Sequence, residues 1–117
     1  DVDMEELTRI AIELRRKAKR PIYVTLSEKG ALLVTEDQHY HLPAAPTKPP
    51  IDPTGAGDTF IAAIGVSLVS GASPLESGII ASLAAGVILK KLNTTGTATP
   101  AEILEKFNEA AENDEWP

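Results

Sequence analysis

The sequence predicts an α/β domain in which helices pack on a mixed sheet. Three observations favour this class: an amphipathic helical pattern opens the chain, short runs rich in β-branched residues follow it, and apolar helical patterns fill the second half. Hydrophobic residues make up 43% of the 117 residues but aromatic residues only 4%, which is typical of aliphatic helices packed on a sheet. The length suits one domain, residues 1–117, with a single core.

The first predicted element is a helix from Asp3 to Lys19. Its apolar residues recur every three or four positions and define one face: Met4, Leu7, Ile10, Ala11, Leu14 and Ala18. Asp3 is expected to cap this helix, and Pro21 to stop it. Basic residues gather at its C-terminal end, where the helix dipole favours positive charge, so a solvated helix end is favoured there over a ligand site.

Three strands are predicted next, in the segments PIYVTL, ALLVTE and QHYHLP, with a turn at SEKG between the first two. The first strand follows a helix and is almost wholly apolar, so we expect it to be buried, with the other two forming a meander at the edge of the sheet. His39 and His41 flank Tyr40 on one face of the third strand. A solvent-facing polar stripe is favoured there over a two-histidine metal site, because no third ligand lies nearby in the sequence.

The segment PAAPTKPP, residues 43–50, holds four prolines and therefore predicts an extended loop. A proline-rich stretch of this kind could also serve as a ligand of an SH3-type domain. A loop that covers the sheet and leads the chain into Asp52 is favoured, because a motif embedded between two ordered elements is poorly placed to be a free peptide.

Three helices are predicted in the second half of the chain. The first runs from about Gly57 to Val69. A capping box at SPLE, beginning at Ser73, opens the second helix, which extends to about Lys90, and a capping box at TPAE, beginning at Thr99, opens the third. The first two helices are apolar almost all round, so we expect both to pack on more than one side.

Charge and composition exclude several classes of function. The formal net charge of −6 argues against broad nucleic-acid binding, which depends on Lys and Arg residues that neutralise phosphates. The chain has no cysteine, which favours a reducing compartment, and we expect a cytoplasmic protein. No apolar run approaches the roughly 20 residues that span a bilayer, so no membrane association is expected.

The most informative stretch is DPTGAGDTF, residues 52–60. A helix cap explains part of it, because Asp and Gly are favoured at helix starts, but the stretch lacks the Lys-Ser or Lys-Thr of a Walker loop and the third glycine of a dinucleotide fingerprint. Gly55 and Gly57 would free the N–H groups of residues 55–58 to form an anion hole at a helix N-terminus. Asp58 inside such a hole would repel a stably bound phosphate, but it is suited to accept a proton from a hydroxyl nucleophile, which indicates a kinase.

This stretch resembles the C-terminal signature of the ribokinase-like (PfkB) sugar and nucleoside kinases. The upstream segment VTLSEKGALLV is similar to the strand and turn of that family, and the downstream segment ASLAAGVILKKLNTTGTATP to its last nucleotide-site helix and loop. The resemblance covers nearly the whole chain. It implies the C-terminal part of a three-layer α/β/α fold, and a transfer of the γ-phosphoryl group of ATP, with Mg²⁺, to an alcohol group of a carbohydrate.

The resemblance also implies roles for individual residues. Asp58 corresponds to the catalytic base, and Gly55, Ala56 and Gly57 correspond to the anion hole. Asp52 and Thr54 correspond to residues that help to hold a monovalent cation, with potassium expected. The positions that correspond to the nucleotide pocket are Thr25, Ser27, Gly30, Ser82, Ala85 and Asn93.

Three departures from the family pattern affect these roles. Ser27 stands where the family often has Gly, and NTTG, residues 93–96, stands where many members have Gly-Ala or Gly-Thr, which puts the turn geometry at both places in doubt. Pro53 replaces a Thr, a change that an extended residue before the loop tolerates. The segment KLNTTGTATPAEIL is most similar to heptose-phosphate and related sugar kinases.

The resemblance implies that the acceptor-binding half, the lid and an upstream Asn-x-x-Glu motif associated with magnesium are absent from the chain. We therefore expect a partial domain that holds most of an ATP site and is inactive alone, whereas the whole kinase would take ATP and a small sugar or sugar phosphate. An exposed strand edge and uncovered helix faces are expected to cause self-association or association with a partner. The alternative is a non-catalytic nucleotide-binding or assembly module that keeps the fold.

Overall fold

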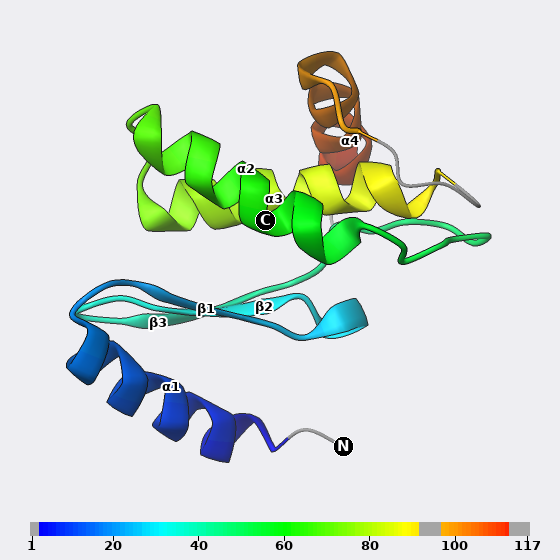
Figure 1. Cartoon of the computed structure of the whole chain (residues 1–117). Coiled ribbons are helices and arrows are strands. Elements are labelled where there is room, and N and C mark those ends of the chain that lie inside the picture. The colour runs from blue at the N-terminus through cyan, green and yellow to red at the C-terminus, as the bar shows by residue number, and fades with distance from the viewer. Residues whose placement is uncertain (1–2, 92–96, 113–117) are drawn as a thin grey trace.

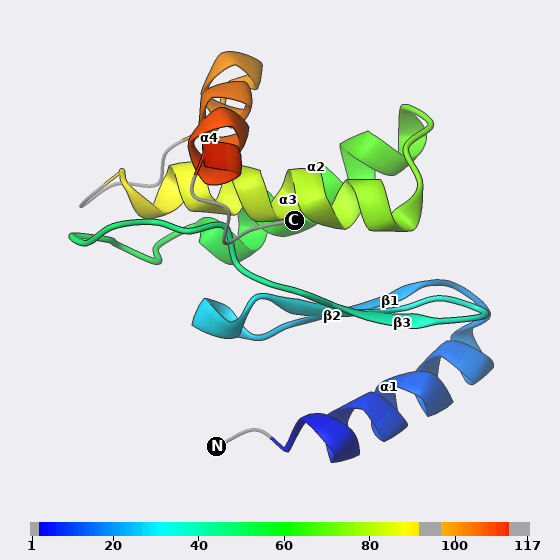
Figure 2. The ribbon, with the colours of Figure 1, turned by 180° about the vertical axis from the view of Figure 1, so that it is seen from behind.

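The computed structural model describes residues 3–91 and 97–112 and arranges them in three layers (Figure 1). Helix α1 covers one face of a sheet, α2 and α3 lie on the opposite face, and α4 packs on α3 (Figure 2). In chain order the elements are α1 (Met4–Ala18), β1 (Ile22–Thr25), the 3-10 helix η1 (Ser27–Lys29), β2 (Ala31–Val34), β3 (His39–Leu42), α2 (Ala56–Val69), α3 (Pro74–Leu89) and α4 (Pro100–Glu112). None of these described helices is long and apolar enough to cross a membrane. The three-layer arrangement expected from the sequence is confirmed.

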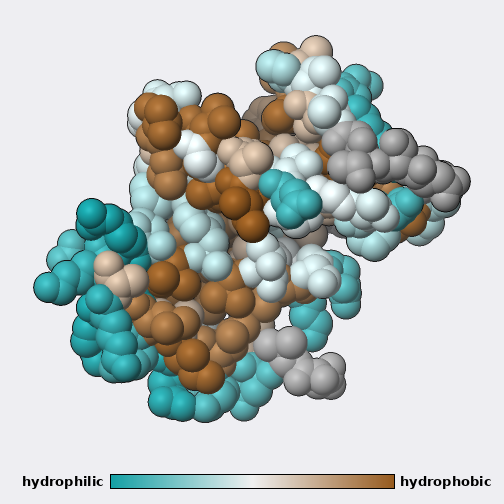
Figure 3. Space-filling model, in the orientation of Figure 1, coloured by the Kyte–Doolittle hydropathy of each residue, from teal (hydrophilic) through white to brown (hydrophobic). Residues whose placement is uncertain are grey.

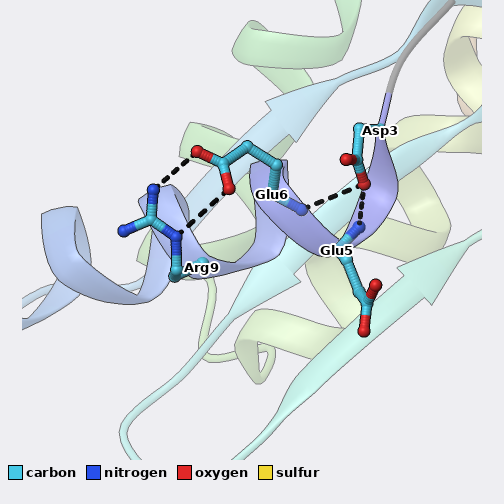
Figure 4. A network of polar contacts seen from close by, with 4 residues as sticks. All are labelled: Asp3, Glu5, Glu6 and Arg9. Atoms are coloured by element: carbon cyan, nitrogen blue, oxygen red, sulfur yellow. Dashed lines mark hydrogen bonds and ion pairs between the residues drawn. The ribbon is translucent and has the colours of Figure 1, made fainter.

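Helix α1 begins as its sequence predicts. The Asp3 carboxylate accepts hydrogen bonds from the N–H groups of Glu5, at 3.1 Å, and Glu6, at 3.2 Å, and so satisfies two donors of the first turn (Figure 4). The Glu6 carboxylate pairs with the Arg9 guanidinium at 2.6 Å on the exposed face. Ala11, on the opposite face, is buried against the sheet. Capping and amphipathicity therefore fix both the start of α1 and the face that it buries.

Strand β2 lies at the centre of the sheet, between β1 and β3. Each of its residues is at most 2% exposed, because β2 has helices on both faces. Leu32 and Val34 pack with Ala11 of α1, and Ala31 packs with Phe60 of α2 on the other side. Strand β1 is only half-buried. The prediction that the first strand is the buried one is therefore wrong, because helices cover both faces of β2 and not of β1.

The described strands pair only antiparallel, β1 with β2 and β2 with β3. The connections between them are short, namely η1 with its flanking residues and residues 35–38, and connections of this length join antiparallel neighbours. The predicted meander is confirmed. A parallel pair, which a mixed sheet requires, is absent from the strands of residues 3–91.

The two histidines of β3 face solvent. His39 and His41 are both exposed, as predicted for a polar stripe, whereas Tyr40 between them is half-buried. The Nε2 atom of His41 lies 2.6 Å from the Lys29 carbonyl oxygen and links β3 to η1. The described residues contain no group of three His, Cys, Asp or Glu side chains that could hold a metal ion.

Residues 43–50 form the extended covering loop that the prolines predict. Ala45 is 5% exposed and packs with Leu83 of α3 and Ala110 of α4. The Lys90 ammonium at the C-terminal end of α3 donates a hydrogen bond to the Lys48 carbonyl oxygen at 2.7 Å. These contacts hold the loop along α3, so the chain reaches Asp52 at a defined position.

Helices α2 and α3 differ in burial although their sequences are equally apolar. Helix α3 is buried on most sides between α2, α4, the sheet and the loop, as predicted. Helix α2 buries only Phe60 and Ser67, while Ile61, Val66 and Val69 are 69%, 68% and 89% exposed. Figure 3 shows hydrophobic side chains gathered over α2 on this side of the molecule. The prediction that α2 packs on more than one side is wrong for the described structure, because no described element covers its outer face.

The capping box of α3 generates a test of local stability. The Ser73 hydroxyl oxygen accepts from the Glu76 N–H at 3.1 Å, and the Glu76 carboxylate accepts from the Ser73 N–H at 2.8 Å, which lowers the pKa of Glu76. Ser73→Ala should lower the free energy of unfolding by about 1 kcal/mol, measured by urea denaturation. Ser70→Ala, at an exposed serine just past the end of α2, is the control and should change it little. Equal losses in both variants would contradict the capping role.

Candidate active site

The segment before α2 is tied to the end of α3. The Asp52 N–H donates to the carbonyl oxygen of Leu89, a residue far along the sequence, at 2.7 Å. The Asp52 Oδ1 atom accepts from both the N–H (3.0 Å) and the hydroxyl (2.7 Å) of Thr54 and so closes a tight turn. Asp52 and Thr54, the predicted cation residues, are therefore brought together, with carboxylate and hydroxyl oxygens side by side.

Gly55 turns the chain from this segment into α2. Its φ of 81° lies in the left-handed region, which glycine adopts without steric cost. The Gly55 carbonyl accepts from the Thr59 N–H at 3.0 Å and begins the hydrogen bonding of the helix. The glycine predicted for the loop is thus required by the backbone of the helix start.

The first turn of α2 presents amide donors to solvent. In the described structure the N–H groups of Gly55, Gly57 and Asp58 have no backbone acceptor, whereas the Ala56 N–H donates to the Pro53 carbonyl at 3.1 Å. Of the four amides predicted to form an anion hole, that of Ala56 is thus engaged within the turn, whereas the other three have no backbone acceptor. Gly57 and Asp58 are exposed, and an added Cβ at Gly57 would meet nothing within 4 Å. Free donors at a helix N-terminus favour an anion there.

Phe60 anchors this turn in the core. Its side chain is 7% exposed and packs with Ala31 of β2 and Ala81 of α3. Its ring meets the ring of Tyr23 edge to face, with centroids 6.4 Å apart. The Tyr23 hydroxyl donates to the Pro74 carbonyl at the start of α3, and burial raises the pKa of Tyr23. The sequence analysis did not predict this role of Tyr23, because no local pattern marks a strand residue that contacts the starts of both α2 and α3.

The predicted nucleotide residues at the end of β1 lie around η1. Thr25 and Ser27 are exposed. Ser27 has a φ of 55°, in the left-handed region that favours glycine, which is the residue expected here from the resemblance. Gly30 has a φ of 89°, and an added Cβ would overlap the Leu42 carbonyl oxygen. The need for glycine at this position therefore comes from the close approach of the chain at the end of β3.

Ser82 and Ala85 occupy different faces of α3. Ser82 is 6% exposed and borders a cavity of about 260 Å³ between α3 and the end of β3. The other residues that line this cavity are Tyr40, His41, Leu42, Pro43, Leu75 and Ile79. Ala85 instead packs towards Phe60 in the core, so the structure does not bring these two predicted residues into one pocket. Asn93 lies outside the described residues.

Comparison with known proteins decides the family. The family model for pfkB family carbohydrate kinases matches residues 1–102. The chain belongs to this family. Bifunctional protein HldE of Aeromonas hydrophila is 41% identical over 101 residues, which cover 85% of this chain and 21% of HldE. The ribokinase of Arabidopsis thaliana, solved with ribose and ATP, is 27% identical with a TM-score of 0.68, over 80% of this chain and 31% of that chain.

A more distant solved kinase shares the fold of this chain. Phosphofructokinase-2 of Escherichia coli, solved in complex with potassium, has a TM-score of 0.80 over 94% of this chain and 35% of that chain, and at 20% identity this likeness concerns the fold alone. The matched segment is therefore a minor part of each relative, about a fifth of HldE and about a third of the solved kinases. The family resemblance predicted from DPTGAGDTF is confirmed, and residues 52–60 lie within the matched range.

A second cavity, which the sequence did not predict, lies between α3, α4 and the covering loop. It measures about 390 Å³, and its lining consists of Lys48, Gly86, Val87, Lys90, Lys91, Glu102, Glu105, Lys106 and Glu109. Two of its lysines are paired, Lys91 with Glu102 at 3.0 Å and Lys106 with Glu109 at 3.7 Å. Lys106 is 6% exposed, and burial lowers its pKa. The charges of the lysine and glutamate side chains that line this cavity therefore largely cancel.

The close contact at Gly30 predicts a large effect of a single methyl group. Gly30→Ala should lower the free energy of unfolding by about 3 kcal/mol or more, because the added Cβ overlaps the backbone at Leu42 and the φ of 89° is unfavourable for alanine. Gly65→Ala is the matched control: nothing lies within 4 Å of the added atom, and alanine in a helix interior should raise stability by about 0.5–1 kcal/mol. Thermal denaturation of both variants measures the difference, and a Gly30→Ala protein as stable as the parent would contradict the placement of this turn.

Proposed function

We propose that this pfkB family segment is the phosphotransferase part of a sugar kinase, which transfers the γ-phosphoryl group of ATP to an alcohol group of a sugar or sugar phosphate. The observation that carries the proposal is an exposed aspartate, Asp58, in the first turn of α2 beside N-terminal amides that lack a backbone partner in the described structure. A base and fixed hydrogen-bond donors at one helix end are what proton abstraction and phosphoryl transfer require together.

The chemical step follows from this arrangement. Asp58 accepts the proton of the acceptor hydroxyl, whose oxygen bonds to the γ-phosphorus as the bond from that phosphorus to the bridging oxygen of ADP breaks. The N–H groups of Gly55, Gly57 and Asp58 receive the charge that develops on the phosphoryl oxygens. Mg²⁺, bound with ATP, supplies charge neutralisation of the triphosphate. Because Phe60 anchors the first turn of α2, these donors and the base keep their positions during transfer.

The cavity beside Ser82 is the proposed seat of the nucleotide base. Its lining is mainly apolar, with Leu42, Pro43 and Leu75 around one buried hydroxyl, which suits a flat heterocycle that needs few polar contacts. Thr25, Ser27 and Gly30 are proposed to flank the nucleotide from the end of β1, and Asn93 from the loop after α3. The ribokinase of Arabidopsis thaliana, solved with ribose and ATP, supports an ATP site in a protein of this sequence class.

Asp52 and Thr54 are the proposed holders of a monovalent cation, with potassium expected. Their oxygens are of the kind that a hard cation prefers, because the Thr54 hydroxyl lies 2.7 Å from the carboxylate of the half-buried Asp52, although Thr54 itself is exposed. The cation would offset phosphate charge beside the anion hole and hold the turn before Gly55. The hydrogen bond from Asp52 to Leu89 fixes where this pair sits relative to α3.

A non-catalytic nucleotide-binding or assembly module is the second candidate. It is favoured by the extent of the match, because the chain spans about a third of the solved kinases and the acceptor-binding half is expected in the remainder. In both cases the proposed compartment is the cytoplasm, and no nucleic-acid partner is proposed for a chain with a net charge of −6. The two candidates differ in whether Asp58 has an acceptor hydroxyl to deprotonate.

Substitution of the proposed base, Asp58, separates the kinase from the non-catalytic module. In a chimera in which this chain replaces the matching segment of Aeromonas hydrophila HldE, Asp58→Asn should lower kcat by at least about 100-fold, because proton abstraction is lost. The affinity for ATP, measured by calorimetry, should change less than about threefold, since Asn keeps the size of the side chain and the amide donors. Asp37→Asn, at an exposed carboxylate between β2 and β3, is the control and should leave kcat unchanged. Near-normal turnover by the Asp58→Asn variant would refute the assignment of Asp58 as the base.

Substitution of Asp52 tests the cation site. Asp52→Asn in the same chimera should raise the potassium concentration that gives half-maximal activity by about tenfold or more, because loss of even an outer-shell group commonly costs about 10–100-fold in metal affinity. The carbonyl oxygen of Asn can still accept from Thr54, so the turn should persist and circular dichroism should not change. An unaltered potassium dependence would rule out Asp52 as a ligand.

A further inference from the structure

The cavity between α3, α4 and the loop of residues 43–50 contains a buried lysine without a hydrogen-bond acceptor in the described structure. Lys106 of α4 is only 6% exposed. Its Nζ atom lies 3.7 Å from the Glu109 carboxylate, which is too far for a normal hydrogen bond, and no other residue of 3–91 and 97–112 accepts one from it. Because an ammonium group carries three donors, and buried donors without acceptors cost free energy, Lys106 is suited to an acceptor from outside the chain.

A glycine of α3 makes room for this lysine. Gly86 is buried inside α3, where α4 lies across that helix (Figure 2). A Cβ added at Gly86 would lie 3.0 Å from the Lys106 Cε atom, and 3.4 Å from atoms of Ala45 and Thr47 in the loop. Glycine weakens the interior of a helix, and the close passage of the Lys106 stem gives a reason for it here. The Cε atom that carries the ammonium group is therefore held beside Gly86, at the wall of the cavity.

A second ammonium group reaches the same cavity. The Lys90 ammonium donates to the Lys48 carbonyl oxygen rather than to a carboxylate, and both residues line the cavity. Burial is the main cause of the lowered pKa of Lys106; Glu109 partly offsets it, and the nearby charge of Lys90 lowers the pKa further. A bound anion would be attracted by both ammonium groups and would offset their repulsion.

The remaining side chains of the cavity limit the negative charge of a ligand. Lys91 is already paired with Glu102 at 3.0 Å. Glu105 and Glu109 also line the cavity, so its carboxylates repel a ligand with several negative charges, such as a nucleoside triphosphate. Val87 adds an apolar wall, and a volume of about 390 Å³ is in the range of small-molecule sites. The lining therefore suits a small molecule with one anionic group.

We propose that this cavity binds the phosphate or carboxylate group of a small molecule, with Lys106 and Lys90 as the residues that hold the anion. The described lining residues come from the loop, α3 and α4, and none comes from α2, where the proposed phosphoryl transfer takes place. The site therefore does not rest on the proposed function. A bound anion would supply the acceptor that the Lys106 ammonium lacks among the described residues, and it would stabilise the packing of α4 on α3.

The first test measures binding of the two kinds of anion. The ¹⁵N-labelled chain is titrated with inorganic phosphate and, separately, with acetate. We expect saturable shifts of the amide signals of Gly86, Val87 and Lys106 with at least one of them, and the tighter anion identifies the preferred group. Lys106→Met should weaken binding about tenfold or more, because it removes the charged donor. Lys17→Met, at an exposed lysine of α1, is the matched control and should bind as the parent does.

The Lys106→Met variant should keep the fold. Methionine retains an unbranched apolar stem that can pack beside Gly86, and the variant no longer buries a charge. Circular dichroism and thermal denaturation without added anion check this. The anion that binds should raise the melting temperature of the parent and leave that of Lys106→Met unchanged.

A second test has a readout that a merely structural lysine would not change. The pKa of Lys106 is measured from its ¹³Cε signal as the pH is varied. A saturating concentration of the anion that binds should raise this pKa, because a nearby negative charge favours the protonated ammonium, whereas chloride at the same ionic strength should not. Lys90→Gln should raise the same pKa without any anion, since it removes a repelling charge, and should weaken anion binding.

Three results would overturn the site: no saturable shift at the cavity with millimolar phosphate or acetate, equal binding by the parent and Lys106→Met, or a Lys106 pKa that the bound anion leaves unchanged. Phosphate-dependent shifts confined to Gly55, Gly57 and Asp58 would place the anion at the first turn of α2, which would support the proposed function and overturn this site. Saturable shifts at the cavity that Lys106→Met abolishes would support the site even if Asp58→Asn left phosphoryl transfer intact.

Discussion

The packing of α2 against α3 is the interaction on which the rest of the structure depends. Helix α3 is the buried centre, in contact with α2, α4, the sheet and the covering loop, and small residues such as Ala81 and Ala84 let its neighbours approach closely. The Asp52 N–H joins the end of α3 at the Leu89 carbonyl, and Phe60 inserts between β2 and α3. The start of α2 is therefore held at both ends of its first turn, which gives an exposed set of donors the rigidity that transition-state stabilisation needs.

That constraint also explains the asymmetry of α2. The inner side must be apolar to pack on α3 and the sheet, and the N-terminus must be open to expose Asp58 and its neighbouring amides. The outer side is apolar too, although nothing in residues 3–91 and 97–112 covers it. In the proposed function, the base Asp58 therefore lies where the inner and outer faces of α2 meet its solvent-accessible N-terminal end.

Local patterns predicted most of the elements and the centre of the site. The caps at Asp3 and Ser73, the helix after Gly55 and the extended proline loop depend on neighbouring residues, and all lie where the sequence places them. Burial could not be predicted as well, because it depends on which elements meet: β2 rather than β1 is covered on both faces, and α2 has an open side. The engaged N–H of Ala56 and the separation of Ser82 from Ala85 follow from exact backbone direction, which periodicity does not specify.

The central claim is that the first turn of α2 forms an anion hole for the phosphates of ATP. Nuclear magnetic resonance of the ¹⁵N-labelled chain, titrated with ATP, magnesium and potassium, tests it directly, because each backbone amide reports its own environment. The account predicts that the amide signals of Gly55, Gly57 and Asp58 shift most and saturate together, while that of Ala56, whose N–H already bonds to Pro53, shifts less. Saturable shifts confined to other parts of the chain, or no shifts at millimolar ATP, would contradict it.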